Sequence, residues 1–422
     1  MEKESTNTSE ALGRAPGRMD FLGGVADYSG GHVLEIPLRK MTTVRVRSTH
    51  GNDWVFTAEG REAGVVNSAP WRSLLREGFS VENAGKLLRA MKVPAWSLYP
   101  FGCLLVWAAD TGWAPPNGLS FSVSSEVPVA MGVSSSAALE IATLRALRQL
   151  SGIDRSDLQL AHLGQAAENR IVGAPCGLMD QLASSCGAPG QFLPICCQPD
   201  LLGEPVPLPK DLALAGWASG VAHSVGGSPY GMARAASFMG KKILETVLGE
   251  TLDYTGKMPW PDLAAQVADL PQSLSGKTFL RQWGEVEDPL TEIDPARHYP
   301  VQASTRFPME ESQRVQSAVH LWRELDAGKG DRLAQLLALG RLLHESHRAY
   351  SDMGLGCPET DKMVSALAAE GAEKGFYGSR ISGGGAGGTV VILVERKALP
   401  RLETICDQWK GPASGKNSLV FV

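Results

Sequence analysis

The chain has 422 residues, of which 43% are hydrophobic and 20% are charged, so it holds enough apolar material for more than one buried core. These values, with 47 glycines and 26 prolines, are those of an ordinary globular protein and exclude a wholly disordered or fibrous chain. The formal net charge of -5 gives no electrostatic reason to bind a polyanion, so nucleic acid is excluded as an expected partner.

The cysteines and the N-terminus indicate the expected cellular setting. The seven cysteines lack the CxxC pairing of a zinc ribbon, and a chain of this length needs no disulfide scaffold, so we expect reduced thiols. Residues 1–10, MEKESTNTSE, are polar, and no run of eighteen apolar residues occurs in the sequence. We therefore expect a flexible tail over residues 1–10 on a cytoplasmic protein with no membrane partner.

Strands and helices are expected to be mixed along the chain. The expected strands are one that ends near Leu22, then His32–Leu38, Met41–Arg47, Leu119–Met131 and Thr389–Val394. The expected helices are one opened by residues 132–136, one over about Asp157–Val172, one that begins near Leu178, and those over Arg332–Tyr350, Glu359–Glu370 and Leu399–Trp409. The segment Thr251–Thr305 has weaker periodicity and is expected to be an irregular excursion. This mixture lacks the regular alternation of a doubly wound sheet and indicates an α+β fold.

The loop Gly132-Val133-Ser134-Ser135-Ser136 is a candidate phosphate site. It joins a predicted strand to a predicted helix, where free backbone amides and the helix dipole favour an anion. A serine hydroxyl there can also complete the coordination shell of Mg2+. An ordinary serine-rich helix start has the same pattern, so the loop alone leaves both interpretations open.

Two other nucleotide signatures fail when they are tested. Gly276-Lys277-Thr278 resembles the end of a P-loop, but Pro271 stands where its first glycine is required. Residues 383–388 match GxGxxG, yet they precede a strand, whereas a dinucleotide fingerprint opens a helix. Close approach to a ligand and a tight turn both explain these glycines.

Several charged side chains suit phosphoryl transfer to a hydroxyl group. A carboxylate such as Asp180 can accept or orient the hydroxyl proton, and a cation such as Arg18 can stabilise charge on the transferring group. Glu168 adds a carboxylate for a metal ion, and Asp27 is a candidate for binding vicinal hydroxyls. Taken singly, Asp180 is better explained as a dipole partner and Arg18 as a surface charge, and an Asx-turn explains Asp27 equally well.

In order, these segments resemble the three signature motifs of the GHMP small-molecule kinases, and the galactokinase branch in particular. The matching segments are Ala15-Pro16-Gly17-Arg18 with Leu22-Gly23, Asp27-Tyr28 and Gly30-Gly31, then Gly132–Ala138, Glu168-Asn169 with Gly173–Gln181, and finally Ser382–Gly388. The resemblance covers Ala11–Val394. It implies a two-domain α+β GHMP kinase fold, with a ribosomal protein S5 domain 2-like N-terminal domain over residues 11–200 and a ferredoxin-like C-terminal domain over residues 201–422.

The resemblance also implies a role for individual residues, with ATP as the co-substrate. Asp180 and Arg18 would be catalytic, and Ser136 and Glu168 would hold Mg2+. The residues implied to bind the sugar are Asp27, Gly24, Val25, Gly177 and Tyr230. The residues implied to bind ATP are Gly132, Val133, Ser134, Ser135, Ser136, Ala137, Gly384 and Gly385.

One departure from the family pattern bears on the sugar. Galactokinases carry Glu-His where this chain has Gly24-Val25, and the glutamate is expected to bind the hydroxymethyl end of galactose. Glycine and valine remove those partners and leave an apolar wall, which favours a sugar without that group, such as L-arabinose. Four segments are similar to the kinase domain of plant L-arabinokinases: Gly23–Gly30, Val172–Gly177, His223–Gly227 and Pro300–Pro308. We expect the chain to be that kinase portion alone.

The sequence therefore predicts an ATP- and Mg2+-dependent sugar 1-kinase, with L-arabinose as acceptor, acting as a monomer or weak homodimer. A galactokinase and a uronic acid 1-kinase are alternatives of the same class. A non-catalytic, galactokinase-like sugar sensor is an alternative of another class. Retention of Arg18, Ser136, Glu168 and Asp180 argues against the sensor.

Overall fold

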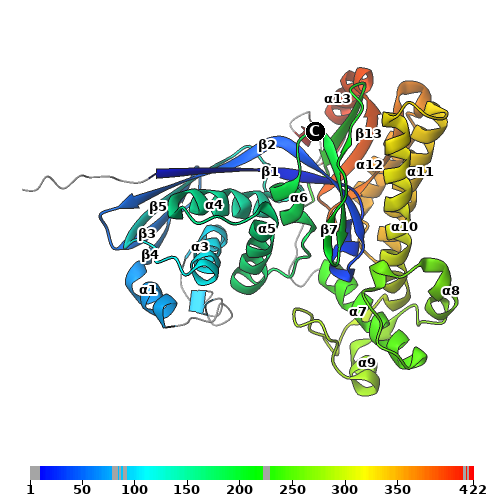
Figure 1. The fold of residues 1–422 in the computed structure, drawn as a ribbon. Coiled ribbons are helices and arrows are strands. Elements are labelled where there is room, and N and C mark those ends of the chain that lie inside the picture. The colour runs from blue at the N-terminus through cyan, green and yellow to red at the C-terminus, as the bar shows by residue number, and fades with distance from the viewer. Residues whose placement is uncertain are drawn as a thin grey trace, which may run out of the picture. The chain divides into compact units, whose positions relative to one another are not determined.

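A computed structural model describes residues 10–77, 84, 87–88, 93–221, 229–411, 415 and 418–422 (Figure 1). The chain divides into two compact units, each built from several segments. Unit 1 comprises Met1–Gly17, Lys40–Pro128 and Ser134–Cys186, and unit 2 comprises Arg18–Arg39, Val129–Val133 and Gly187–Val422. Strands β1 (Glu10–Leu22) and β2 (His32–Thr49) pair with each other, and each contributes residues to both units.

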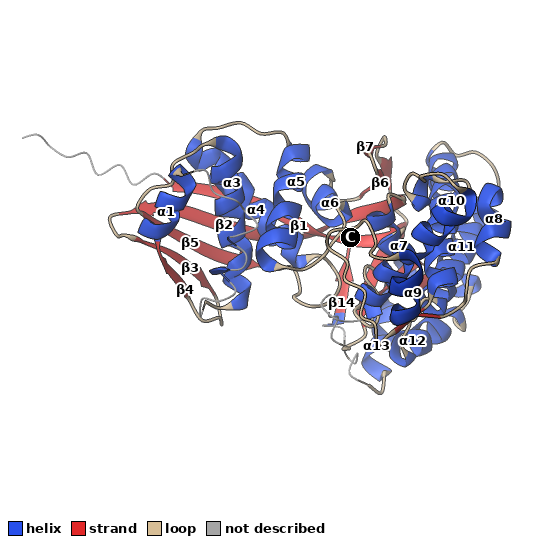
Figure 2. Ribbon diagram, turned by 90° about the horizontal axis from the view of Figure 1, so that it is seen from below, coloured by secondary structure: helices blue, strands red, loops and turns tan. Residues whose placement is uncertain are grey.

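Unit 1 is a sheet with helices on one face, which Figure 2 shows. The strand order is β4-β3-β5-β2, in which β3 and β5 are parallel and the other pairs are antiparallel. The strands that join β2 are β3 (Asp53–Ala58), β4 (Gly64–Asn67) and β5 (Gly118–Ser125). The helices are α1 (Ser68–Arg76), α3 (Leu98–Thr111), α4 (Ser135–Ser151), α5 (Asp157–Ala166), the π-helical turn Ala167–Val172 and α6 (Met179–Cys186).

The core of unit 1 is aromatic and lies between the sheet and the helices. Phe56 of β3 and Phe121 of β5 stack with their ring centroids 4.7 Å apart, and Phe101 of α3 contacts Phe56 at 5.7 Å. The predicted helix Asp157–Val172 is confirmed, because the π-helical turn continues α5 without a break. A capping box fixes its start, with the Ser156 hydroxyl accepting from the Gln159 amide.

Unit 2 contains a four-stranded antiparallel sheet in the order β12-β13-β9-β14. These strands are β9 (Leu212–Ala218), β12 (Phe376–Ser382), β13 (Thr389–Glu395) and β14 (Leu419–Phe421). Helices α12 (Pro358–Ala368) and α13 (Leu399–Gln408) pack on it through a cluster that includes Met363, Leu402, Trp217 and Ile392. Separately, β6 (Gln191–Cys197) pairs with the first residues of β2 and with β7 (Asp200–Leu202) and β8 (Val206–Pro207).

The remaining helices of unit 2 form a second layer. They are α7 (Pro229–Leu248), α8 (Trp260–Ala268), α9 (Gly276–Trp283), α10 (Val301–Asp326) and α11 (Arg332–Asp352), with the short pair β10 (Leu274–Ser275) and β11 (His298–Tyr299). The long helices α10 and α11 run side by side in Figure 1, and α11 also packs against β12. No helix in the described ranges is long and apolar enough to cross a membrane.

Four of the expected elements differ from the structure. His32–Leu38 and Met41–Arg47 are one continuous strand, because β6 pairs with its first part and β5 with its second. The strand expected to reach Met131 already ends at Ser125. The segment Thr251–Thr305 was expected to be irregular, but it contains α8, α9 and the start of α10, whose apolar side chains pack with α7. The tail was predicted over residues 1–10, but Glu10 is the first residue of β1; residues 1–9 lie outside the described residues.

We predict that the close crossing of α11 over β12 requires a glycine. A Cβ at Gly340 would lie 1.9 Å from the Tyr377 carbonyl oxygen, which is backbone and cannot rotate away. Gly340→Ala should therefore lower the free energy of unfolding by about 2 kcal/mol or more in urea titrations. The matched control is Gly231→Ala in α7, where nothing lies within 4 Å of the added Cβ; it should leave stability unchanged or raise it by up to about 1 kcal/mol. Equal effects of both substitutions would contradict the packing argument.

Candidate active site

The start of α4 has the features of an anion site. Ser134 precedes the helix in the left-handed region, with φ 55° and ψ 50°, and its side chain makes no capping hydrogen bond. Its hydroxyl oxygen is buried and has no hydrogen-bond partner in the described part of the chain. Ser135 and Ser136 are the first residues of the helix, and Ala137 behind them is buried in the core. A phosphate at this helix start would satisfy the free amides and the orphan hydroxyl together.

Unit 1 also brings three of the expected site side chains together. The Ser136 hydroxyl donates to the Glu168 carboxylate, and the charge of Asp180 acts on the same carboxylate. Glu168 lies on the π-helical turn, and Asp180 lies in the first turn of α6. The metal candidates and the expected catalytic carboxylate therefore form one cluster within unit 1.

Two residues that the sequence analysis missed complete this cluster. The Gln181 amide donates to Glu168 Oε2 at 2.8 Å and to Glu140 Oε2 at 3.0 Å. Glu140 and Gln181 are both fully buried, and Glu140 projects from the apolar face of α4. A carboxylate on an apolar helix face, one turn after Ser136, is a signal that sequence reasoning could have used.

Burial and mutual repulsion shift the proton equilibria of these carboxyl groups. Burial, followed by the charge of Asp180, raises the pKa of Glu168 to about 7. Burial, followed by the charge of Glu168, raises the pKa of Glu140 well above its ordinary value. Burial and the neighbouring carboxylates thus favour the protonated form of Glu140.

The loop before α6 is fixed by Asn169. Its side-chain oxygen accepts from the Cys176 amide at 2.8 Å, and its side-chain nitrogen donates to the Cys176 carbonyl at 3.3 Å. Gly177 follows and is buried, and α6 begins two residues later. These contacts hold Asp180 in a defined position relative to Glu168.

The donor set of this cluster fits Mg2+. A carboxylate at Glu168 and a hydroxyl at Ser136 are hard oxygen ligands. Mg2+ takes few ligands from the protein and completes its octahedron with water and phosphate oxygens. The described residues hold no group of three or more His, Cys, Asp or Glu side chains arranged for a metal ion, so a cage supplied wholly by such residues is not part of this site.

Unit 2 joins Arg18 to the first part of the phosphate loop. Arg18 Nη1 donates to the Gly132 carbonyl at 2.9 Å, and the Arg18 amide donates to the Val133 carbonyl at 3.1 Å. The guanidinium forms a buried ion pair with Glu35, with Nε 3.2 Å from Oε2. A Cβ at Gly383 would lie 3.3 Å from Arg18 Nη2, so the third glycine motif, Ser382–Gly388, also lies beside the Arg18 guanidinium. Residues of all three motifs therefore meet in unit 2.

Most glycines of the third motif are required by backbone conformation. Gly383, Gly385, Gly387 and Gly388 all have positive φ, and a Cβ at Gly385 would lie 2.8 Å from Leu355. Gly384 has no positive φ and is partly exposed. The tight turn thus accounts for the four glycines with positive φ, and close approach of a ligand at Gly384 stays a prediction.

The expected sugar residues in unit 2 gather around one turn. Gly24, Val25 and Asp27 belong to the 3-10 turn η1 (Gly24–Ser29), and Val25 shares an apolar cluster with Tyr28 and Tyr230 of α7. The rings of Tyr28 and Tyr230 meet edge to face with their centroids 5.8 Å apart. The segment 223–227, which is similar to plant L-arabinokinases, lies outside the described residues.

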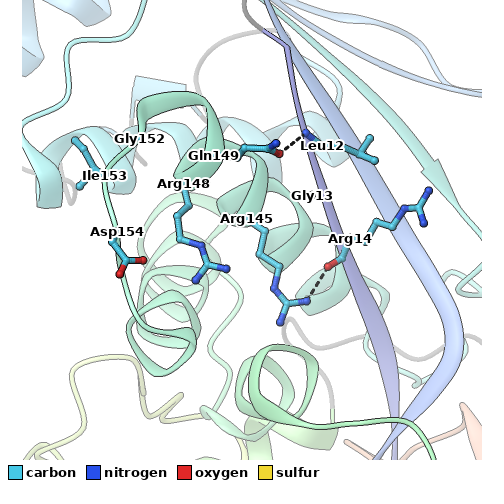
Figure 3. Close-up of a pocket in the computed structure, with 9 residues that line it drawn as sticks. All are labelled: Leu12, Gly13, Arg14, Arg145, Arg148, Gln149, Gly152, Ile153 and Asp154. Carbon is cyan, nitrogen blue, oxygen red and sulfur yellow. Dashed lines mark hydrogen bonds between the residues drawn. The ribbon is translucent and has the colours of Figure 1, made fainter.

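A separate cavity of about 420 Å³ lies at the opposite end of α4 (Figure 3). Arg145 and Arg148 line it, but Arg145 donates to the Arg14 carbonyl and Arg148 donates to Asp157 and to the Arg155 carbonyl. These cations are already engaged by protein oxygens. We therefore do not assign this cavity to the reaction.

The buried Glu140 carboxyl predicts a pH-dependent stability. Below its ordinary pKa of 4.5 the folded and unfolded chains both hold the proton, whereas above 4.5 only the folded chain does, so stability falls as pH rises towards the raised pKa. Glu140→Gln removes this dependence. We measure the free energy of unfolding of the variant and of the parent in urea without Mg2+. We expect the variant's value minus the parent's to increase by up to about 1.4 kcal/mol per pH unit from about pH 5 to 7. A difference that is constant over this range would show that Glu140 is ionised in the folded protein.

Comparisons with known proteins identify the family of this chain. Three family models match: the GHMP kinase N-terminal domain over residues 99–188, the GHMP kinase C-terminal domain over 333–410, and the galactokinase galactose-binding signature over 3–48. The chain is 33% identical to a galactokinase of Bos taurus over 95% of this chain and 88% of that one. It is also 33% identical to an L-arabinokinase of Arabidopsis thaliana over 97% of this chain, and it spans about half, 45%, of that longer protein.

A solved structure supports the fold. The galactokinase of Lactococcus lactis, complexed with galactose, superposes with a TM-score of 0.73 at 21% identity, over 94% of this chain and 88% of that chain. The predicted two-domain α+β GHMP kinase fold is confirmed. The chain belongs to the galactokinase family of the GHMP kinases and is a phosphotransferase that acts on a sugar.

Proposed function

We propose that this protein is an ATP-dependent sugar 1-kinase whose acceptor is L-arabinose. The observation that carries the choice of sugar is Gly24-Val25, where galactokinases carry Glu-His. Val25 is 2% exposed and packs among apolar and aromatic side chains, and Gly24 beside it is buried. An apolar wall suits a sugar that ends in a ring carbon without a hydroxymethyl group. The similarity to an L-arabinokinase supports the same choice.

The proposed reaction assigns a task to each charged residue. GHMP sugar kinases use ATP as co-substrate. The anomeric oxygen of the sugar bonds to the γ-phosphorus while the bond to the β–γ bridging oxygen breaks and ADP leaves. Asp180 accepts or orients the hydroxyl proton, and Arg18 stabilises charge on the transferring group.

The phosphates and the metal ion would be held by the motif residues. Ser134, Ser135 and the amides at the start of α4 would bind the ATP phosphates, together with Gly132 and Gly384. Ser136 and Glu168 would hold Mg2+, which when bound neutralises phosphate charge. Because the pKa of Glu168 is raised to about 7, its proton must leave before the carboxylate can serve as a ligand.

Galactose is the second candidate acceptor, supported by the galactokinase relatives and by the matching galactose-binding signature. A uronic acid acceptor would need a cation near Gly24 and Val25, and a sensor without catalysis would bind a sugar but show no turnover. The domain division at residue 200, the cytoplasmic location and the monomer or weak homodimer stay predictions.

We predict a clear order of acceptors. With ATP and Mg2+, kcat/KM for L-arabinose should exceed that for D-galactose by about tenfold or more, because the apolar wall leaves the galactose hydroxymethyl without a hydrogen-bond partner. The measurement is coupled-assay kinetics on a panel that also holds D-galacturonate and D-glucuronate. Preference for galactose would keep the kinase and reject the sugar assignment, and absence of turnover on all four would favour the sensor.

We predict that Asp180→Ala lowers kcat by roughly 100- to 10,000-fold, since it removes the proton acceptor of the transfer step. Asp154→Ala, at an exposed position beside the cavity of Figure 3, is the matched control and should keep full activity. Both variants should unfold at the parent temperature. Near-normal turnover by a folded Asp180→Ala variant would overturn the assignment.

A further inference from the structure

Tyr350 of α11 links the proposed sugar turn to the third glycine motif. Its side chain is fully buried, and its hydroxyl accepts from the Val25 amide at 3.0 Å. The same hydroxyl donates to the Gly383 carbonyl at 2.6 Å. Burial raises the pKa of Tyr350 well above its ordinary value, so the hydroxyl keeps the proton that it donates. The Tyr350 side chain thus holds the backbone of the turn at Val25 and the backbone of the third glycine motif at Gly383.

The Tyr350 hydroxyl also fills the space that a side chain at position 24 would need. A Cβ built on Gly24 would lie 1.7 Å from the hydroxyl oxygen and 2.9 Å from the ring carbon that carries it. Both separations are too short for non-bonded atoms. The φ of Gly24 is +48°, which non-glycine residues tolerate at a cost of about 1–2 kcal/mol, so the steric conflict is the stronger constraint.

Tyr350 cannot move aside cheaply, because its ring is held on two sides. The Arg380 guanidinium lies 4.9 Å from its ring centroid, and the ring of Phe307 meets it edge to face at 5.3 Å. Arg380 is itself paired with Asp20 at 3.0 Å, and both are fully buried. The conflict with a side chain at position 24 is therefore built into the core.

We propose that Tyr350 is a specificity-determining positioning residue: its hydroxyl imposes a glycine at position 24 and sets Val25 as the wall that the sugar meets. This inference rests on the proposed function, in which the turn at Gly24-Val25 contacts the end of the sugar where galactose carries its hydroxymethyl group. It follows that the Glu-His pair of galactokinases cannot be grafted onto this turn while Tyr350 is present.

The steric part is tested by a double-mutant cycle of Gly24→Ala and Tyr350→Leu, read by urea unfolding. Gly24→Ala should destabilise the parent, and it should destabilise the Tyr350→Leu background much less, because the two closest conflicting atoms are gone and Asp20 Oδ2, at 3.0 Å, is the remaining close neighbour. This readout needs no sugar, so it stands even if the choice of L-arabinose fails. Equal effects of Gly24→Ala in both backgrounds would overturn the steric claim.

The specificity part is tested by the ratio of kcat/KM for L-arabinose to that for D-galactose. Tyr350→Phe keeps the ring and removes both hydrogen bonds, and we expect the ratio to fall about tenfold or more as the turn loosens. Adding Gly24→Glu and Val25→His to Tyr350→Leu should then raise galactose turnover well above that of the same pair with Tyr350 present. A merely structural role would lower turnover of both sugars equally and leave the ratio unchanged.

Tyr377→Phe is the matched control, because it removes a tyrosine hydroxyl of the same unit that donates to Glu395 instead. It should leave the ratio at the parent value. A parent enzyme that prefers galactose would reject the proposed sugar, whereas an unchanged ratio in folded Tyr350→Phe would reject this inference. The two failures are therefore distinguishable.

Discussion

The buried ion pair between Asp20 and Arg380 is the contact on which the motif arrangement of unit 2 depends. It joins the end of β1 to β12 across 360 residues of sequence, with both side chains fully buried. The same Asp20 carboxylate accepts from the Gly24 amide at 3.2 Å and from the Gly383 amide at 2.8 Å. Loss of either charge would leave the other buried and unpaired, at a cost of about 3–5 kcal/mol. The proposed sugar turn and the third glycine motif thus share one anchor.

In unit 1, by contrast, carboxyl groups crowd together near the expected catalytic residue Asp180. Burial and the nearby charge of Asp180 disfavour the charged forms of Glu140 and Glu168, and no cation among the described residues is hydrogen-bonded to Glu168. Such crowding destabilises the folded protein and persists where function requires it. A divalent cation with bound phosphates would relieve the repulsion, which supports the proposal that Ser136 and Glu168 hold Mg2+.

Much of the fold was predictable because helical periodicity, and the glycines that mark turns and helix ends, are local features of the sequence. The helices at Ser135, Met179, Arg332 and Leu399 begin at or within one residue of where the sequence indicated. Helix α10 was not predicted, because Pro308 lies inside it and reads as a helix breaker, although the helix is stabilised by packing against α7 and α11. Site residues were named through the motifs. Tyr350 was not, since its partner Val25 lies 325 residues away and no local pattern marks the contact.

The proposed reaction transfers a phosphoryl group to the anomeric oxygen of a pentose. Phosphorus NMR of the product formed from ATP and L-arabinose by the purified protein tests this directly. We expect a sugar phosphate whose phosphorus couples to the anomeric proton, formed in equal amount with ADP. A phosphate on any other carbon, or ATP hydrolysis to inorganic phosphate alone, would contradict it.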